Sequence, residues 1–134
     1  MAMSGKSKRS IEQIAREVGR YPPDAYYFVQ EGLSHTVQRV HGDPAAVPEG
    51  QRHVTGQQLS WGLAELALEK WGLLAPVVLQ RWNITNTLDF GRIVFAMVEH
   101  SLMRKRPTDR LEDFLDVYDF RKVFDKQFQI ATED

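Results

Sequence analysis

The segment NTLDFGRIVFAMVEHSL, residues 86–102, decides the fold because its apolar side chains leave little room for a polar face. Asn86 and Asp89 have the spacing of a helix N-cap and its capping partner, so we expect a helix to begin here and to run to about Leu102. The strip of this helix that can face water is narrow, and it consists of Asp89, Arg92, Ala96, Glu99 and His100. More than half of the circumference is covered by Phe90, Ile93, Val94, Phe95, Met97, Val98 and Leu102. The pattern predicts a helix at the centre of the molecule.

The turn before this helix leaves a second interpretation open. Residues 82–86, WNITN, make a short connection between two predicted helices, as in a helix-turn-helix that reads DNA. A recognition helix offers its first residues to base edges, whereas residues 87–90 here supply one acid and two apolar side chains. The wide apolar coverage therefore favours a corner of a packed bundle over a reading head.

Helix signals recur on both sides of this segment. Ser10 with Gln13, and Thr55 with Gln58, repeat the capping-box spacing, so helices should begin at these positions. Gly19 and Gly72 are natural stops for the two helices. Gly32 lies within an apolar helix face, where its use is to let another helix or an aromatic ring come close.

Three more helices are predicted from prolines and apolar spacing. Residues 22–23 are prolines that suit the start of a helix reaching residue 40, and Pro76 suits the first turn of a short helix. In that short helix we expect apolar contacts from Leu74, Val77, Val78 and Trp82. A last amphipathic helix is indicated by Phe120, Phe124 and Phe128, which are four residues apart.

The fold class that follows is mainly all-α, a compact single domain of five or six helices over residues 10–130. A chain of 134 residues with 43% apolar residues can bury one core of this size. Residues 1–9 are expected to be a flexible basic N-terminus and residues 131–134 a tail. Residues 114–120 are ambiguous and compatible with a short extended piece.

Composition excludes several classes of function. The 17 basic and 18 acidic residues nearly cancel, so no global field attracts nucleic acid or an anionic membrane. The chain has no cysteine, which excludes disulfides, thiol catalysis and cysteine-based metal sites. No run of 18 apolar residues and no signal-peptide core is present, so we expect a soluble cytoplasmic protein that does not bind a membrane.

No catalytic, metal or cofactor motif is recognisable, so we expect no enzyme, no cofactor and no small-molecule ligand. The histidines His35, His41, His53 and His100 lack the spacing of helical metal ligands. Glu99 and His100 are adjacent on a helix and therefore diverge by about 100°. A deep pocket that gathers His53, Tyr26 and Glu99 would instead favour an enzyme.

The strongest candidate site is on the predicted helix that begins at Thr55. Trp61 and Leu68 lie off its main apolar stripe, with Tyr27 from the preceding helix as a third candidate. Clustered exposed aromatic residues mark interfaces with proteins, either another protein or a second copy. The alternative is that the C-terminal phenylalanines cover these residues.

A second candidate from another class is binding of DNA or structured RNA. Two short basic segments could contact phosphates: Lys6, Lys8 and Arg9, and Arg104, Lys105 and Arg106. Alternatively, residues 104–106 only neutralise the C-terminal end of the preceding helix. One continuous basic surface would support this function, whereas scattered charges would weaken it.

Five blocks of the chain resemble a known family: RYPPDAYYFVQEGL, HVTGQQL, ALEKWG, WNITNTLDFGRIVFAMVEHSLM and DFLDVYDFRKVF. They are similar, over roughly residues 20–128, to an uncharacterised bacterial protein family found mainly in planctomycete and verrucomicrobial lineages. The resemblance implies a small cytoplasmic protein of such a bacterium. It implies no activity, cofactor or site residue, because none is established for that family.

Overall fold

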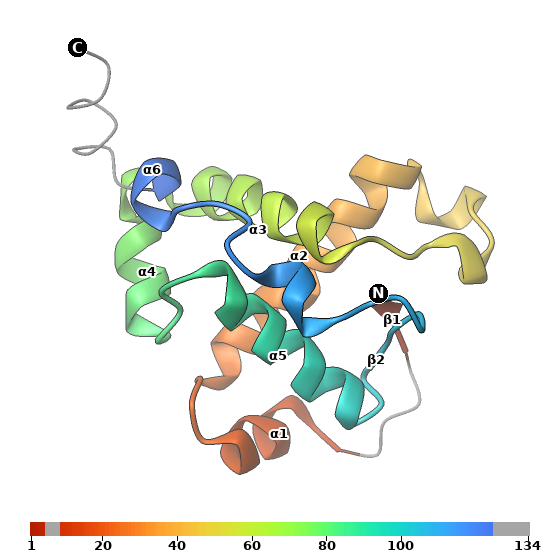
Figure 1. Ribbon diagram of the computed structural model, residues 1–134, viewed down its shortest axis with the longest axis horizontal. Coiled ribbons are helices and arrows are strands. Elements are labelled where there is room, and N and C mark those ends of the chain that lie inside the picture. Colours follow the sequence, from red (N-terminus) through yellow and green to blue (C-terminus); the bar gives the residue numbers. More distant parts are fainter. Residues whose placement is uncertain (5–8, 125–134) are drawn as a thin grey trace.

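The computed structural model describes residues 1–4 and 9–124, and in them the prediction of a mainly helical domain is confirmed (Figure 1). Six α-helices are described: α1 (Ile11–Val18), α2 (Pro23–His41), α3 (Gly56–Trp71), α4 (Ala75–Arg81), α5 (Thr87–Glu99) and α6 (Phe120–Phe124). Short 3-10 helices are η1 (Pro44–Ala46), η2 (Glu49–Gln51), η3 (Gly72–Leu74) and η4 (Leu111–Phe114). The described strands are β1 (Ala2–Met3) and β2 (Met103–Arg104). None of the described helices is long and apolar enough to span a membrane.

The predicted helix starts are confirmed by complete capping boxes. Ser10, Thr55 and Asn86 each accept a hydrogen bond from the backbone N–H three residues on, and the side chain at that position bonds back to the cap. At the other end of α1, Gly19 has a left-handed φ of 71°, which glycine adopts without strain. Local sequence therefore sets these boundaries.

The α5 helix is the centre of the fold, as its sequence predicts. Phe90, Ile93 and Val94 have no exposed surface, and α5 contacts α1, α2, α3, β2 and η4. Figure 1 shows α5 between α1 and α3. The strip expected to face water is narrower than predicted, because Asp89 and Ala96 are buried. The helix also ends at Glu99, three residues before the predicted end.

The α2 and α3 helices pack antiparallel at very short range. A Cβ atom on Gly32 would lie 2.1 Å from Leu63 Cδ2, and one on Gly62 would lie 1.9 Å from Thr36 Oγ1. Both positions therefore need glycine, and the expected role of Gly32 in close helix packing is confirmed. The contact fixes the α3 helix, which carries the candidate site, against α2.

One expectation about irregular segments is wrong. Residues 1–4 are not a loose terminus: Met1 and Ala2 are buried, and β1 pairs antiparallel with β2, with Ala2 opposite Arg104. In the segment 114–120, which the sequence leaves ambiguous, the backbone at Leu115 is extended, and the chain passes from η4 to α6 without forming a strand. Lys6, Lys8, Phe128 and the tail 131–134 lie outside the described residues.

Candidate interaction surfaces

Trp61 and Leu68 form an exposed ridge on the outer side of α3, and we refer to these two residues as the α3 ridge. Trp61 is 50% exposed and Leu68 is 41% exposed. Seven residues separate them, which places both on one helix face about 10 Å apart. Ala64, which lies between them in the sequence, is buried. Although α3 has α2 on one flank and η4 and α6 on the other, the ridge stays open.

Tyr118 holds the Trp61 ring in place from the C-terminal segment. The two ring centroids are 4.5 Å apart, and the Tyr118 hydroxyl donates to the Ser60 carbonyl at 2.8 Å. Burial raises the pKa of Tyr118, so the phenol remains a neutral donor. Phe120 and Phe124 pack on Tyr118 in turn. Tyr118, backed by these two phenylalanines, thus covers one side of the Trp61 ring, and half of Trp61 stays exposed.

A shallow hollow of about 300 Å³ lies beside Trp61, between α2 and α3. Val40, 41% exposed, and Trp61 give it apolar walls. Its charged rim is the ion pair of Arg39 with Glu65. An apolar centre with a polar rim is the usual anatomy of a protein-binding surface.

The corner where α3 turns into α4 exposes three further apolar side chains. Leu73 and Leu74 are each 63% exposed, and Val77 is 48% exposed. The expected apolar contacts are made by Trp82 but not by Leu74 of η3 and Val77 of α4, which are exposed; within residues 72–82 only Ala75 and Leu79 are buried. Beneath the corner, three aromatic rings pack together: Phe28, Trp71 and Trp82. A helix this short has too little periodicity to predict which face is buried.

Tyr27 is not brought together with the α3 ridge. In the antiparallel pair, Thr36 contacts Gly62 and Glu31 contacts Lys70. Trp61 therefore lies beside the C-terminal half of α2, whereas Tyr27 lies in its first two turns. The Tyr27 side chain is 46% exposed, and its hydroxyl donates to Glu12 of α1 at 2.6 Å. The geometry therefore does not support Tyr27 as part of the same surface as the α3 ridge.

Of the two basic segments, the structure describes Arg9 and residues 104–106, and part of their charge is already engaged in ion pairs. Arg106 forms an ion pair with Asp109 at 3.4 Å, and Arg9 forms one with Glu17. Arg104, the last residue of β2, and Lys105, which follows it, are exposed. The described residues therefore show a local basic corner and not a continuous basic face.

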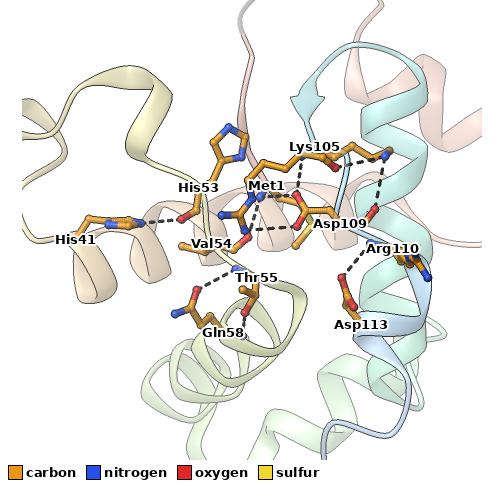
Figure 2. Close-up of polar contacts among 11 residues, drawn as sticks. Met1, His41, His53, Val54, Thr55, Gln58, Lys105, Asp109, Arg110 and Asp113 are labelled. Atoms are coloured by element: carbon orange, nitrogen blue, oxygen red, sulfur yellow. Dashed lines mark hydrogen bonds and ion pairs between the residues drawn. The ribbon is translucent and has the colours of Figure 1, made fainter.

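Met1 is enclosed by this corner (Figure 2). Its ammonium donates to the Val54 carbonyl at 2.7 Å and to Asp109 Oδ2 at 3.1 Å, and its side chain has no exposed surface. Burial lowers the pKa of the ammonium group, and the neighbouring Asp109 opposes that change. Burial alone would raise the pKa of Asp109, but hydrogen bonds from the Arg106 backbone and from Met1 hold it below its usual value. Sequence reasoning missed this site because nothing local links residues 1, 54 and 109.

A second buried carboxylate, Asp89, ties the start of α5 to the chain before α2. Asp89 Oδ1 accepts hydrogen bonds from the Tyr21 hydroxyl and from Arg92, and Oδ2 accepts from the Thr85 backbone at 2.8 Å. Burial alone would raise the pKa of Asp89, but these hydrogen bonds outweigh it and hold the pKa below the usual value. Because all these partners are structural, Asp89 is a packing element and not a candidate acid or base.

The residues that would have favoured an enzyme do not come together. Tyr26 is fully buried in the core, Glu99 is exposed at the end of α5, and His53 lies in the loop before α3. His41 contacts the backbone carbonyl of His53 at 2.7 Å. Among residues 1–4 and 9–124, no three histidines or acids lie close enough to hold a metal ion.

Comparison of the chain with protein-family models, curated proteins and solved structures finds no match. The functional reasoning below therefore uses only the residues of this chain.

Proposed function

We propose that this protein is a non-catalytic interaction module that binds a protein partner, another protein or a second copy of itself, through the α3 ridge. The observation that carries the proposal is that Trp61 stays half exposed although Tyr118 fixes its ring. Binding energy at interfaces concentrates in tryptophan, tyrosine and arginine. A ring that is already oriented loses little side-chain entropy when a partner covers it.

The surroundings of the ridge supply the rest of an interface. The hollow beside Trp61 adds Val40, which is 41% exposed, as a further apolar contact, with Arg39 and Glu65 at its rim. Half of a tryptophan surface is on the order of 100 Å². Trp61 can therefore act as the anchor of an apolar centre that polar residues surround, as in known interfaces.

The setting that we propose is the cytoplasm of a bacterium. The resemblance of residues 20–128 to a bacterial family and the absence of cysteine support this setting. Membership of that family is part of the same proposal.

The test compares two double variants of matched exposure. Trp61→Ser with Leu68→Ser removes the ridge, whereas Val18→Ser with Tyr27→Ser removes side chains that are 40% and 46% exposed elsewhere. Sedimentation velocity over a range of concentrations measures self-association, and quantitative affinity capture from the host measures other partners.

We expect the ridge variant to lose the self-association or the captured partner, and the matched variant to keep it. Unchanged oligomeric state together with an unchanged set of partners in the ridge variant would remove the proposal. Equal losses in both double variants would also contradict it, because the ridge would then have no special role.

A further inference from the structure

The α3 ridge has the spacing of a face that pairs with another helix. Trp61 and Leu68 are seven residues apart, which is two helical turns and the repeat at which helices pack along one another. A helix laid along α3 therefore meets two anchors about 10 Å apart. When two copies of α3 lie side by side in opposite directions, the first anchor of each faces the second anchor of the other. The ridge is complementary to itself in this arrangement.

The charged side chains beside the ridge lie on the side that faces α2, which we call the α2 flank. Gly62 marks this flank, because a Cβ atom there would meet α2. At 100° per residue, Glu65 and Glu69 lie about 40° and 80° from Trp61, in the direction of Gly62. Glu65 forms an ion pair with Arg39 of α2. One flank of the ridge thus carries charges of both signs.

Two of these charges can reach a partner. Arg39 is 66% exposed although it pairs with Glu65. Glu69 is exposed, and within residues 1–4 and 9–124 it forms no ion pair. Because α2 runs antiparallel to α3 and Thr36 lies beside Gly62, Arg39 lies about one turn before Gly62 along α3. Arg39 and Glu69 of one chain are therefore about 15 Å apart along the helix and cannot pair with each other.

We propose that the α3 ridge binds the α3 ridge of a second copy, with the two α3 helices antiparallel and related by a two-fold axis. Trp61 of each copy then packs against Leu68 of the other copy. The axis passes midway between positions 61 and 68, so Glu69 of the second copy comes level with position 60. The rotation keeps the two α2 flanks on the same side, and Glu69 of the second copy therefore lies beside Arg39. This pairing rests on the proposed function and names its partner.

The charges favour this pairing over contact with an unrelated apolar helix. A two-fold dimer makes each contact twice, so two ion pairs between Arg39 and Glu69 join two contacts between Trp61 and Leu68. Glu65 lies nearest the axis, where its ion pair with Arg39 offsets the repulsion between the two copies. The contact area is small, so we expect a weak dimer with Kd on the order of 10 to 100 µM.

The experiment is sedimentation equilibrium of the full chain over a range of concentrations. Arg39→Glu and Glu69→Arg each place like charges opposite one another, and the two variants are measured separately and as an equimolar mixture. Lys70→Glu is the matched control. Lys70 is an exposed residue of α3 about 180° from Trp61, and its reversal also breaks an ion pair within the chain, with Glu31. Circular dichroism checks that each variant is folded.

We expect the wild type to dimerise and either single variant to dimerise at least about tenfold more weakly, because both charge contacts become repulsive. The mixture should recover wild-type association. In the mixed dimer one contact joins Glu at position 39 to Arg at position 69, and the other joins Arg39 to Glu69. The Lys70→Glu chain should stay within about twofold of the wild type, because its position is solvent-exposed on the far side of α3.

Four results would overturn this pairing, and they bear differently on the proposed function. A wild type that stays monomeric removes the dimer, but the proposed function stands if the ridge variant loses a partner captured from the host. A dimer that needs the ridge but is not restored by mixing removes only the antiparallel arrangement. Equal weakening by Lys70→Glu removes the role of the α2 flank. A dimer that persists in Trp61→Ser with Leu68→Ser removes the ridge from self-association, and capture from the host then decides the proposed function.

Discussion

The α5 and α3 helices are both rich in apolar residues, yet the fold uses them differently. Five elements surround α5, and Glu99 is its only residue classed as exposed. In contrast, α3 is also packed on several sides, by α2, α4, α5, α6, η3 and η4, and still keeps Trp61 and Leu68 half exposed. The difference teaches that apolar content alone does not separate residues that form the core from residues that stay exposed. What decides is whether the neighbouring elements cover the face on which a residue lies.

The largest expected effect comes from opening a cavity in α5. Phe90→Ala should lower the free energy of unfolding by about 3 to 5 kcal/mol, because Phe90 is fully buried. Leu68→Ala in α3 should cost less than about 1 kcal/mol, because Leu68 is 41% exposed. Urea unfolding followed by circular dichroism measures both values. Similar losses for the two variants would erase the distinction between the helices.

A somewhat smaller effect is expected at the polar start of α5. Asp89→Asn should lower the free energy of unfolding by about 2 to 3 kcal/mol at pH 7, because it removes a buried charged acceptor from Tyr21 and Arg92. The folded-state pKa of Asp89 lies below its usual value. Its ionised form therefore stabilises the fold fully above the unfolded pKa of about 3.9, and this contribution is lost as the pH falls through the folded-state pKa.

The pH dependence gives a separate test of the Asp89 site. Urea midpoints measured from pH 7 down to pH 3 should fall in the wild type. They should fall less steeply in Asp89→Asn, where only groups such as Asp109 still contribute. Identical slopes below pH 4 would mean that Asp89 is not held in its charged form by the fold.

An intermediate effect is expected where α2 and α3 touch. Gly62→Ala should cost about 1 to 3 kcal/mol, because the new Cβ would meet Thr36 Oγ1. Adding Thr36→Ala removes that oxygen, so the double variant should lose less stability than the sum of the single variants, by about 1 kcal/mol. Strict additivity in unfolding experiments would show that the helices are not this close.

The smallest effect on stability is expected at the α3 ridge. Trp61→Ser should lower the free energy of unfolding by about 1 kcal/mol, mainly through the lost contact with Tyr118. A loss above about 3 kcal/mol in thermal or urea unfolding would identify Trp61 as a core residue. Loss of association in the ridge variant would then reflect unfolding and not the loss of a surface contact.

Much of the helical framework is predictable from the sequence because its signals are local. The cap pairs at Ser10, Thr55 and Asn86 lie three residues from their partners, so spacing alone identifies them. The burial of α5 follows from its apolar periodicity. The close approach at Gly32 follows from a glycine on an apolar face.

The rest could not be predicted because it depends on contacts between distant residues. The strand pair joins residues 2–3 to residues 103–104, and strands of two residues carry no alternation of polar and apolar side chains. The polar composition of residues 1–9 concealed the burial of Met1. For the candidate site, the apolar second side of α3 was visible in the sequence. That Tyr27 lies apart, and that Leu73 and Leu74 point outward, required the packing of whole helices.

Native-state hydrogen exchange tests the central distinction most directly. If α5 is the interior of the fold, the amides of Ile93 and Val94 exchange only when the whole protein unfolds, and their exchange free energy equals the free energy of unfolding from urea. An exchange free energy of these amides that is several kcal/mol below the free energy of unfolding would contradict this account. It would mean that α5 opens on its own and is available to a partner.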